Sequence, residues 1–248
     1  MKISLYQNDK PQLTTFVKTP HPHIVEVLAH TKLDFLILDT EHAPFDRTTL
    51  DLCTMAARGA QVPTIIRLES GTPSAILNAL DCGASGLLIP HVTTAEQART
   101  LVKKSHFGHG GRGYAGSTRA AGYGSKSIEE HIRTSRHSLT LIVQIEDPEG
   151  VDHAEEIAAI DGIDALFIGQ VDLAVAYGAN SVNSPLVIEA SERVIAAAQK
   201  HNKPIGLFVS DAVKVPLWFQ KGIHFFAIGS DHQMMLAGFH QQREQLEQ

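Results

Sequence analysis

Short, almost uninterrupted apolar runs recur about eight times along the chain, and a segment with helical spacing follows each of them. Continuous runs of this kind are typical of strands buried on both faces, whereas half-exposed antiparallel strands alternate polar and apolar residues. The runs lie at 13–17, 35–39, 64–67, 86–92, 141–146, 165–172, 204–209 and 225–229. Strands that alternate with helices predict a parallel sheet with helical crossovers.

Eight such units in 248 residues favour an α/β fold with a single (β/α)8 TIM barrel spanning residues 1–248. An open doubly wound sheet is the alternative that the same alternation leaves open. No linker or change in composition indicates a second domain. The chain is 43% hydrophobic and 19% charged, which is ordinary for a globular protein with a large core.

Charge and composition argue against several classes of partner. The net charge is -6 and the basic residues are scattered, which argues against a nucleic-acid-binding surface. Cys53 and Cys82 form neither a CxxC pair nor a disulfide framework. No apolar run approaches the roughly 20 residues of a membrane span. The first nine residues lack the apolar segment of a signal peptide, so we expect a cytoplasmic protein.

Polar residues that end the apolar runs are the candidates for chemistry, because active sites of (β/α)8 barrels lie at the carboxyl ends of the strands. Glu146 and Asp172 each end such a run. Two carboxylates, with neutral ligands or water completing the shell, suit Mg²⁺ or Mn²⁺. Taken singly, either acid could instead cap a helix or form a surface ion pair.

Arg67 and His42 are expected at the same end of the barrel. Arg67 ends an apolar run, where it could bind an oxyanion or form an internal salt bridge with Asp39 or Glu41. His42 follows two carboxylates, which could orient its ring as a general base, although it could also be an ordinary loop histidine. No lysine stands clearly at the end of a central strand, which argues against a Schiff-base aldolase.

A glycine-rich loop at Gly108–Gly124 could be mistaken for a phosphate cradle. It lacks the GxxxxGK[ST] pattern, and it lacks GxGxxG spacing between a strand and a helix. We interpret it as a mobile active-site loop or a subunit contact, with Arg112 and Arg119 as possible substrate contacts.

Six short motifs along nearly the whole chain carry a family resemblance. They are DTEHAP (39–44), IR (66–67), DCGA with LIP (81–84, 88–90), TAEQA (94–98), VQIE (143–146) and FIGQVDLA (167–174). Each is weak alone, but the ordered set resembles the HpcH/HpaI aldolases, which are metal-dependent (class II) pyruvate aldolases.

This resemblance implies a role for each matching residue. It implies that Glu146 and Asp172 bind Mg²⁺, Mn²⁺ or Co²⁺, that Arg67 contacts a pyruvate enolate, and that His42 with Asp39 forms an acid–base dyad. The implied contacts of the 2-oxo acid are Gln144 and the backbone amides of Gly169, Gln170, Val171 and Asp172. The resemblance also implies a hexamer in which neighbouring subunits exchange the last helix.

The implied reaction is reversible cleavage of a 4-hydroxy-2-oxo acid to pyruvate and an aldehyde. A 2-keto-3-deoxy sugar acid or 4-hydroxy-2-oxoheptanedioate would be the substrate. Three departures bear on specificity: Gln170 replaces the proline of GPxDLA, residues 177–185 differ from LGxxGxxxHP, and Leu68-Glu69-Ser70 follows Arg67. The alternatives are a citrate-lyase-like CoA-thioester lyase and a non-catalytic barrel that binds 2-oxo acids.

Overall fold

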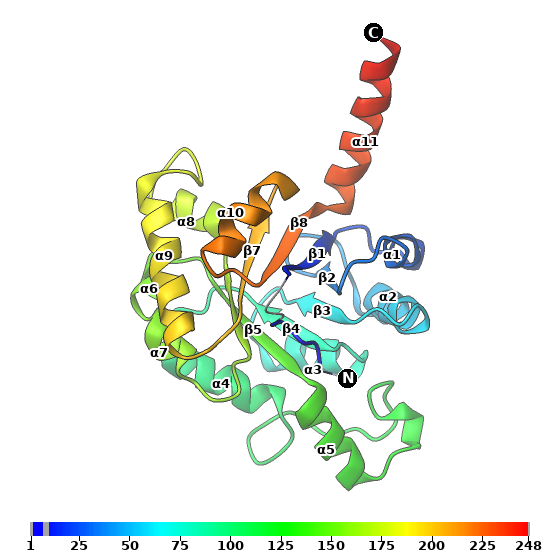
Figure 1. The fold of residues 1–248 in the computed structure, drawn as a ribbon. Coiled ribbons are helices and arrows are strands. Elements are labelled where there is room, and N and C mark those ends of the chain that lie inside the picture. Colours follow the sequence, from blue (N-terminus) through cyan, green and yellow to red (C-terminus); the bar gives the residue numbers. More distant parts are fainter. Residues whose placement is uncertain (1, 7–9, 248) are drawn as a thin grey trace.

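A closed barrel of parallel strands forms the centre of the molecule, as a computed structural model covering residues 2–6 and 10–247 describes it (Figure 1). Consecutive strands are neighbours, and β8 closes the ring on β1. The strands are β1 (Gln12–Val17), β2 (Leu36–Asp39), β3 (Thr64–Arg67), β4 (Gly86–Ile89), β5 (Thr140–Ile145), β6 (Ala165–Ile168), β7 (Ile205–Val209) and β8 (Phe225–Ser230). The predicted (β/α)8 barrel is therefore confirmed.

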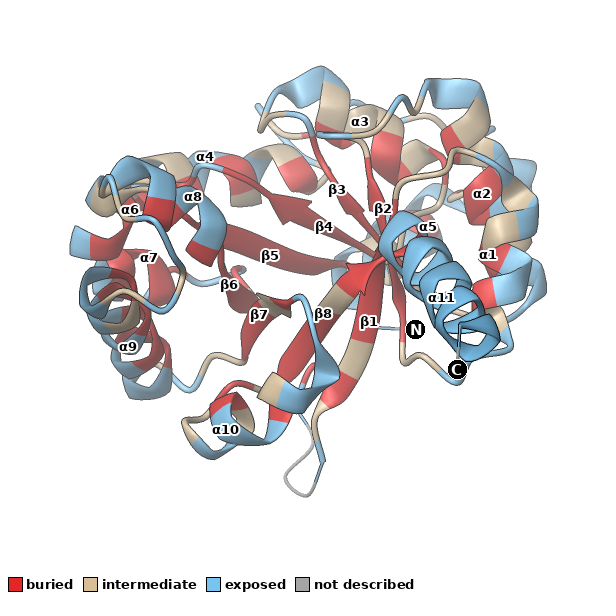
Figure 2. Ribbon diagram, turned by 90° about the horizontal axis from the view of Figure 1, so that it is seen from above, coloured by how far each residue is buried: buried red, intermediate tan, exposed pale blue. Residues whose placement is uncertain are grey.

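Helices surround this barrel and cover the outer faces of its strands (Figure 2). The α-helices are α1 (Pro22–Ala29), α2 (Arg47–Gly59), α3 (Pro73–Asp81), α4 (Ala95–Ser105), α5 (Ile128–Ser138), α6 (Pro148–Asp152), α7 (Ala154–Ala158), α8 (Gln170–Ala176), α9 (Pro185–Lys200), α10 (Val215–Gln220) and α11 (Asp231–Leu246). Two 3₁₀ turns, η1 (Gly122–Gly124) and η2 (Ala212–Lys214), complete the described elements. Polar side chains fix several helix starts; Thr94, Ser127 and Ser184, for example, each accept a backbone N–H bond in the first turn.

The core has two layers, one inside the barrel and one between the strands and the helices. Phe16, Phe167 and Phe225 dominate the inner layer, where Leu5 of the N-terminal segment joins them. Gly206 makes room for two of these rings, because a Cβ atom there would lie 2.1 Å from the Phe225 ring and 2.5 Å from that of Phe167. The barrel interior is therefore packed with side chains rather than open.

Two predicted strands are shorter than the sequence indicates: β4 ends at Ile89 and not at Val92, and the earlier end of β6 moves a predicted site residue. The apolar run 165–172 does not form one strand: β6 ends at Ile168, and α8 begins at Gln170. Gly169 turns the chain with φ -93° and ψ 76°, while Val171 continues the apolar pattern into the helix. The prediction placed Asp172 at a strand end, but it lies in the first turn of α8.

The last helix, α11, projects away from the barrel (Figure 1) and is exposed along most of its length (Figure 2). In the part of the chain that the structure describes, no helix is long and apolar enough to cross a membrane. The expected cytoplasmic location was based on the first nine residues. Of these, Met1 and Gln7–Asp9 lie outside the described residues.

Candidate active site

A cavity of about 340 Å³ opens at the carboxyl ends of the strands and brings most of the predicted residues together. Its lining residues are Phe16, Lys18, His42, Arg67, Gln144, Phe167, Gly169, Gln170, Val171, Asp172, Phe208, Gly229, Ser230 and Gln233. Two further predicted residues, Asp39 and Glu146, contact Arg67 and Gln144 of this lining. The nine residues to which the family resemblance assigns a role thus lie in or directly against one cavity.

A buried ion pair joins β2 to β3 on one side of this cavity. Arg67 donates from Nε and Nη2 to the two carboxylate oxygens of Asp39, at 2.9 and 2.8 Å. Its Nε also lies 3.3 Å from Oε2 of Glu41, and its guanidinium covers the Phe16 ring at 4.3 Å. Burial would raise the pKa of Asp39, but the hydrogen bond and charge of Arg67 outweigh burial and hold this pKa below its ordinary value.

Lys18 was missed by the sequence analysis, which found no lysine clearly at a strand end. It directly follows β1, lines the cavity, and places Nζ 3.2 Å from Oδ2 of Asp39. Its side chain is 28% exposed, so the ammonium group stands at the edge of the cavity with hydrogen atoms free for an incoming anion. The signal was its position immediately after the first apolar run.

His42 lines the cavity, but its ring does not contact Asp39 as the predicted dyad implies. The contact between the two residues is a backbone bond of 3.2 Å, from the His42 N–H to Oδ1 of Asp39. The ring instead places Nε2 3.7 Å from Oε2 of Glu41, and the side chain is exposed. Both oxygens of Asp39 accept hydrogen bonds from Arg67 and neither is bonded to the His42 ring. The catalytic role of His42 stays a prediction.

The opposite side of the cavity holds a buried acid that no lysine or arginine of the described residues neutralises. Glu146 directly follows β5 and is 2% exposed. Its Oε1 accepts the backbone N–H of His91 at 2.9 Å, and its Oε2 accepts the amide group of Gln144. Burial raises the pKa of Glu146 to about 7, because these bonds and the nearby His91 ring only partly compensate for lost hydration.

These residues fit a hard divalent cation. Oε1 of Gln144 is buried beside Glu146 and has no hydrogen-bond partner among the described residues, and the charge of Asp172 is close enough to raise the pKa of Glu146 further. Carboxylate and amide oxygens are the donors that Mg²⁺ and Mn²⁺ prefer. No group of three His, Cys, Asp or Glu side chains is placed for a metal within residues 2–6 and 10–247, so a cation here would need other oxygen ligands.

Gly169 allows the buried acid and the start of α8 to approach each other. A Cβ atom at Gly169 would lie 2.6 Å from Cβ and 2.7 Å from Oε2 of Glu146. The Gly169 N–H is not free, since it donates to the Ile145 carbonyl at 3.0 Å. Gln170, Val171 and Asp172 form the first turn of α8, whose amides have no partner within the helix.

Gln170, which stands at the family's proline position, bonds away from the strand ends. It is buried, and its Nε2 donates to Oγ of Ser191 on α9 at 2.9 Å. This bond ties the start of α8 to the neighbouring helix. Val171 is half exposed on the same turn, where it lines the cavity.

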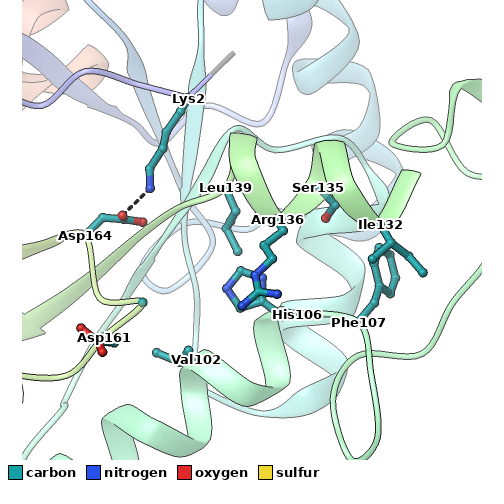
Figure 3. A pocket seen from close by; sticks show the side chains of 11 residues that line it. Lys2, Val102, His106, Phe107, Ile132, Ser135, Arg136, Leu139, Asp161 and Asp164 are labelled. Atoms are coloured by element: carbon teal, nitrogen blue, oxygen red, sulfur yellow. Dashed lines mark hydrogen bonds and ion pairs between the residues drawn. The ribbon is translucent and has the colours of Figure 1, made fainter. Parts of the chain in front are cut away.

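The glycine-rich loop does not bring its arginines to this cavity. Arg119 forms a two-bond ion pair with Asp51 of α2, at 3.1 and 2.6 Å. Arg112 is buried against Phe107 and α5. A separate cavity of about 390 Å³ lies beside α5 (Figure 3), lined in part by Leu139 and Asp164, which directly precede β5 and β6 at the other end of the barrel.

The fold and the site together define a class: a (β/α)8 barrel with a buried arginine and a pair of carboxylates at the carboxyl ends of its strands. Residues 12–237 match the HpcH/HpaI aldolase/citrate lyase family, and the chain belongs to that family. A 5-keto-4-deoxy-D-glucarate aldolase of Klebsiella pneumoniae is 35% identical over 222 residues, which cover 89% of this chain and 86% of the relative. The Salmonella arizonae enzyme of the same name is 36% identical, with 88% and 85% covered.

Solved structures of the family have the same architecture. An HpcH/HpaI aldolase/citrate lyase family protein of Burkholderia cenocepacia superimposes with a TM-score of 0.93 at 30% identity, covering 98% of this chain and 97% of the other. An HpcH/HpaI aldolase of Desulfitobacterium hafniense gives 0.89 at 25% identity, with 96% and 93% covered. Citrate lyase structures are 14% to 16% identical and therefore bear on the fold alone.

Proposed function

We propose that this protein is a divalent-metal-dependent aldolase that reversibly cleaves a 4-hydroxy-2-oxo acid to pyruvate and an aldehyde. The proposal rests on one cavity that is lined by Arg67, Gln144 and Asp172. Asp39 is hydrogen-bonded to Arg67 of this lining, and Glu146 to Gln144. Curated relatives that are 35–36% identical over most of the chain are named as aldolases. No comparable observation favours a CoA-thioester lyase or a non-catalytic barrel.

The cavity residues divide the work of a retro-aldol reaction. A base takes the proton of the C4 hydroxyl, the C3–C4 bond breaks, and its electrons move toward the C2 carbonyl oxygen of the pyruvate half. His42 is our candidate for the base, because its ring lies on the cavity wall. Arg67 is held rigidly by Asp39 and presents a fixed positive charge to the developing negative charge on that oxygen.

Glu146 and Asp172 are the residues that would hold the metal, with Gln144 beside them. A bound Mg²⁺, Mn²⁺ or Co²⁺ would supply Lewis-acid polarisation of the 2-oxo group. The free amides of Gln170, Val171 and Asp172 are our candidates for binding the substrate carboxylate. They are not tied up in the helix, whereas the Gly169 amide is already bonded.

We propose a dicarboxylic sugar acid of the 5-keto-4-deoxy-D-glucarate type as the substrate. Counted from its oxo end, that compound is a 4-hydroxy-2-oxo acid with a second carboxylate at the far end. Its cleavage yields pyruvate and a three-carbon aldehyde that keeps the second carboxylate. Lys18 supports this choice, because its ammonium group lies on the cavity wall with capacity for another anion.

A coupled assay for pyruvate release tests the reaction. We expect pyruvate from 5-keto-4-deoxy-D-glucarate, loss of activity in EDTA, and recovery with Mg²⁺, Mn²⁺ or Co²⁺. Activity that survives complete metal removal would contradict the mechanism. Borohydride reduction in the presence of pyruvate provides a second check, since a covalent adduct on Lys18 would indicate imine chemistry instead.

We also propose a homo-oligomer, with the hexamer expected from the resemblance. α11 supports this, because it projects from the barrel and exposes Met234, Met235, Leu236 and Phe239 to solvent. Exposed apolar side chains gathered on a projecting helix are typical of a subunit contact. Light scattering on the purified protein measures the assembly, and a monomer at micromolar concentration would contradict it.

A further inference from the structure

A further cavity lies on the other side of α5 from the cavity of Figure 3. It has a volume of about 450 Å³ and is lined from α2 by Arg58, from α3 by Leu80, from the turn before β4 by Ser85, and from α5. Ser135 and Leu139 line both spaces, so α5 forms the wall between them. Because it adjoins the residues that precede β4 and β5, it lies at the end of the barrel away from the catalytic cavity.

The residues that line this α5 cavity carry positive charges and no negative charge. Three of its residues are cations, and no Asp or Glu is among the residues that line it. The cations are Arg58, Arg112 and Lys126; the hydroxyl groups are those of Ser85, Thr134, Ser135 and Ser138. The cavity of Figure 3 differs, since Lys2 there forms an ion pair with Asp164 and a further acid, Asp161, lines the wall.

Arg112 is the most informative of these cations, because it is 6% exposed. Its guanidinium lies over the Phe107 ring at 4.0 Å, and Nη2 donates to Oγ of Ser135 at 3.1 Å. Its Nε is buried without a hydrogen-bond partner, and no carboxylate of the described residues lies within ion-pair distance of it. A buried cation without an anion is costly, so this site favours an anionic ligand. Burial lowers the pKa of Arg112 to about 10, which still leaves it charged at neutral pH.

His131 provides a second unsatisfied group on the same wall. It is 2% exposed, and its Nδ1 has no hydrogen-bond partner among residues 2–6 and 10–247. Burial and the charges of Lys126 and Arg112 lower its pKa, so the ring is neutral at neutral pH and can donate from one nitrogen. Asp81 is near enough to influence both Arg112 and His131, but it lines no part of the cavity.

We propose that the α5 cavity binds the phosphate group of a small phosphorylated metabolite. A phosphate dianion offers enough acceptor oxygens for the guanidinium of Arg112, the ammonium of Lys126 and the hydroxyl of Ser135 together. The volume leaves room for an organic group beside the phosphate, and it falls in the range of small-molecule sites. The ligand could be free phosphate or a phosphate monoester, which share this chemistry.

Isothermal titration calorimetry on the full-length protein tests the proposal, with inorganic phosphate, glycerol 3-phosphate and glycerol as probes. We expect saturable binding of one or both phosphate compounds and none of glycerol. Tighter binding of glycerol 3-phosphate identifies a monoester site, and tighter binding of inorganic phosphate identifies a site for the free ion. The double variant Arg58→Ala/Lys126→Ala removes two cations outside the core and should weaken binding by about tenfold or more.

A matched control is Arg136→Ala, which removes an exposed cation on α5 that faces the cavity of Figure 3. It should leave phosphate affinity unchanged, and circular dichroism should show all variants folded. Equal affinity in the double variant and the wild type would overturn the proposal, as would the absence of binding to either phosphate compound. Loss of binding in Arg67→Ala alone would place the phosphate in the catalytic cavity and would also overturn it.

Discussion

The two sides of the catalytic cavity hold their charges in opposite ways. On the β2–β3 side, the carboxylate of Asp39 is bound by Arg67 and approached by Lys18, so burial is compensated within the protein. On the β5–α8 side, Glu146 is equally buried but has no lysine or arginine partner in the part of the chain that the structure describes, and its pKa rises to about 7. The buried charges of the β2–β3 side are balanced within the protein. The β5–α8 side lacks a positive charge, which a metal ion would supply.

This difference shows how to separate residues that shape the site from residues that await a ligand. Removing one partner of a buried ion pair leaves the other charge uncompensated. A buried acid without a partner instead destabilises the fold until its cation binds. Substitutions on the two sides should therefore differ in their effects on turnover, metal affinity and stability.

The largest effect is expected for Glu146→Gln. The substitution keeps the size and polarity of the side chain but removes the negative charge that would hold the cation. We expect kcat/KM for pyruvate release to fall by about 10³-fold, as for loss of several kcal/mol of transition-state stabilisation. Titration with Mn²⁺ should show weakened binding, and unchanged Mn²⁺ affinity would contradict the metal assignment.

Arg67→Lys is expected to come next, with a loss of about 10²-fold in kcat. A lysine keeps the charge but cannot form the two parallel bonds with Asp39, so the cation is no longer fixed. Steady-state kinetics and Mn²⁺ titration check this together. Metal affinity should stay near that of the wild type, which would distinguish this side of the cavity from the Glu146 side.

Lys18→Met should give a smaller, substrate-dependent effect. We expect kcat/KM for the dicarboxylic 5-keto-4-deoxy-D-glucarate to fall by about tenfold, the value of one charge-assisted contact at a partly exposed position. A related 2-keto-3-deoxy sugar acid without the second carboxylate should be cleaved at nearly the wild-type rate. Equal losses on both substrates would show that Lys18 acts through Asp39 rather than on the second carboxylate.

The smallest effect concerns the stability of the metal-free protein as a function of pH. The pKa of Glu146 is raised from 4.5 to about 7 by folding, so the folded state binds more protons than the unfolded state between these values. Its contribution therefore becomes less favourable as pH rises from about 4.5 to about 7, and it stays unfavourable above that range.

Glu146→Gln removes this contribution. In EDTA at pH 8, the variant should unfold at a temperature a few degrees above that of the wild type, and the difference should shrink toward pH 5. Thermal unfolding of both proteins at several pH values measures it. A wild type as stable as the variant at pH 8 would mean that Glu146 is already compensated without metal.

The fold was predictable because the strands of a parallel barrel are buried on both faces and therefore appear as continuous apolar runs. The gathering of Arg67 and Gln144 around one cavity followed from the rule that barrel sites lie at strand ends, whereas Asp172 reaches the same cavity from the first turn of α8. The end of β6 was not predictable from hydrophobicity, because Val171 extends the apolar pattern past Gly169 into α8.

The partners of the charged groups were also beyond sequence reasoning. Whether Asp39 bonds to Arg67 or to the ring of His42 depends on side-chain directions across neighbouring strands, and the sequence leaves both open. The approach of Lys18 to Asp39 depends on the register of β1 against β2 and on the direction of the Lys18 side chain, which an apolar pattern does not indicate.

The carboxylate of Asp39 lies between two positive groups, and this limits what can be learned by replacing it. An alanine at this position would leave the ammonium of Lys18 and the guanidinium of Arg67 repelling each other in a largely dry space. This repulsion would lower the yield of folded protein. An inactive Asp39 variant would therefore say little about proton transfer. The acid–base chemistry is better tested by replacing His42, because its exposed ring can be changed while the ion pairs of Asp39 stay in place.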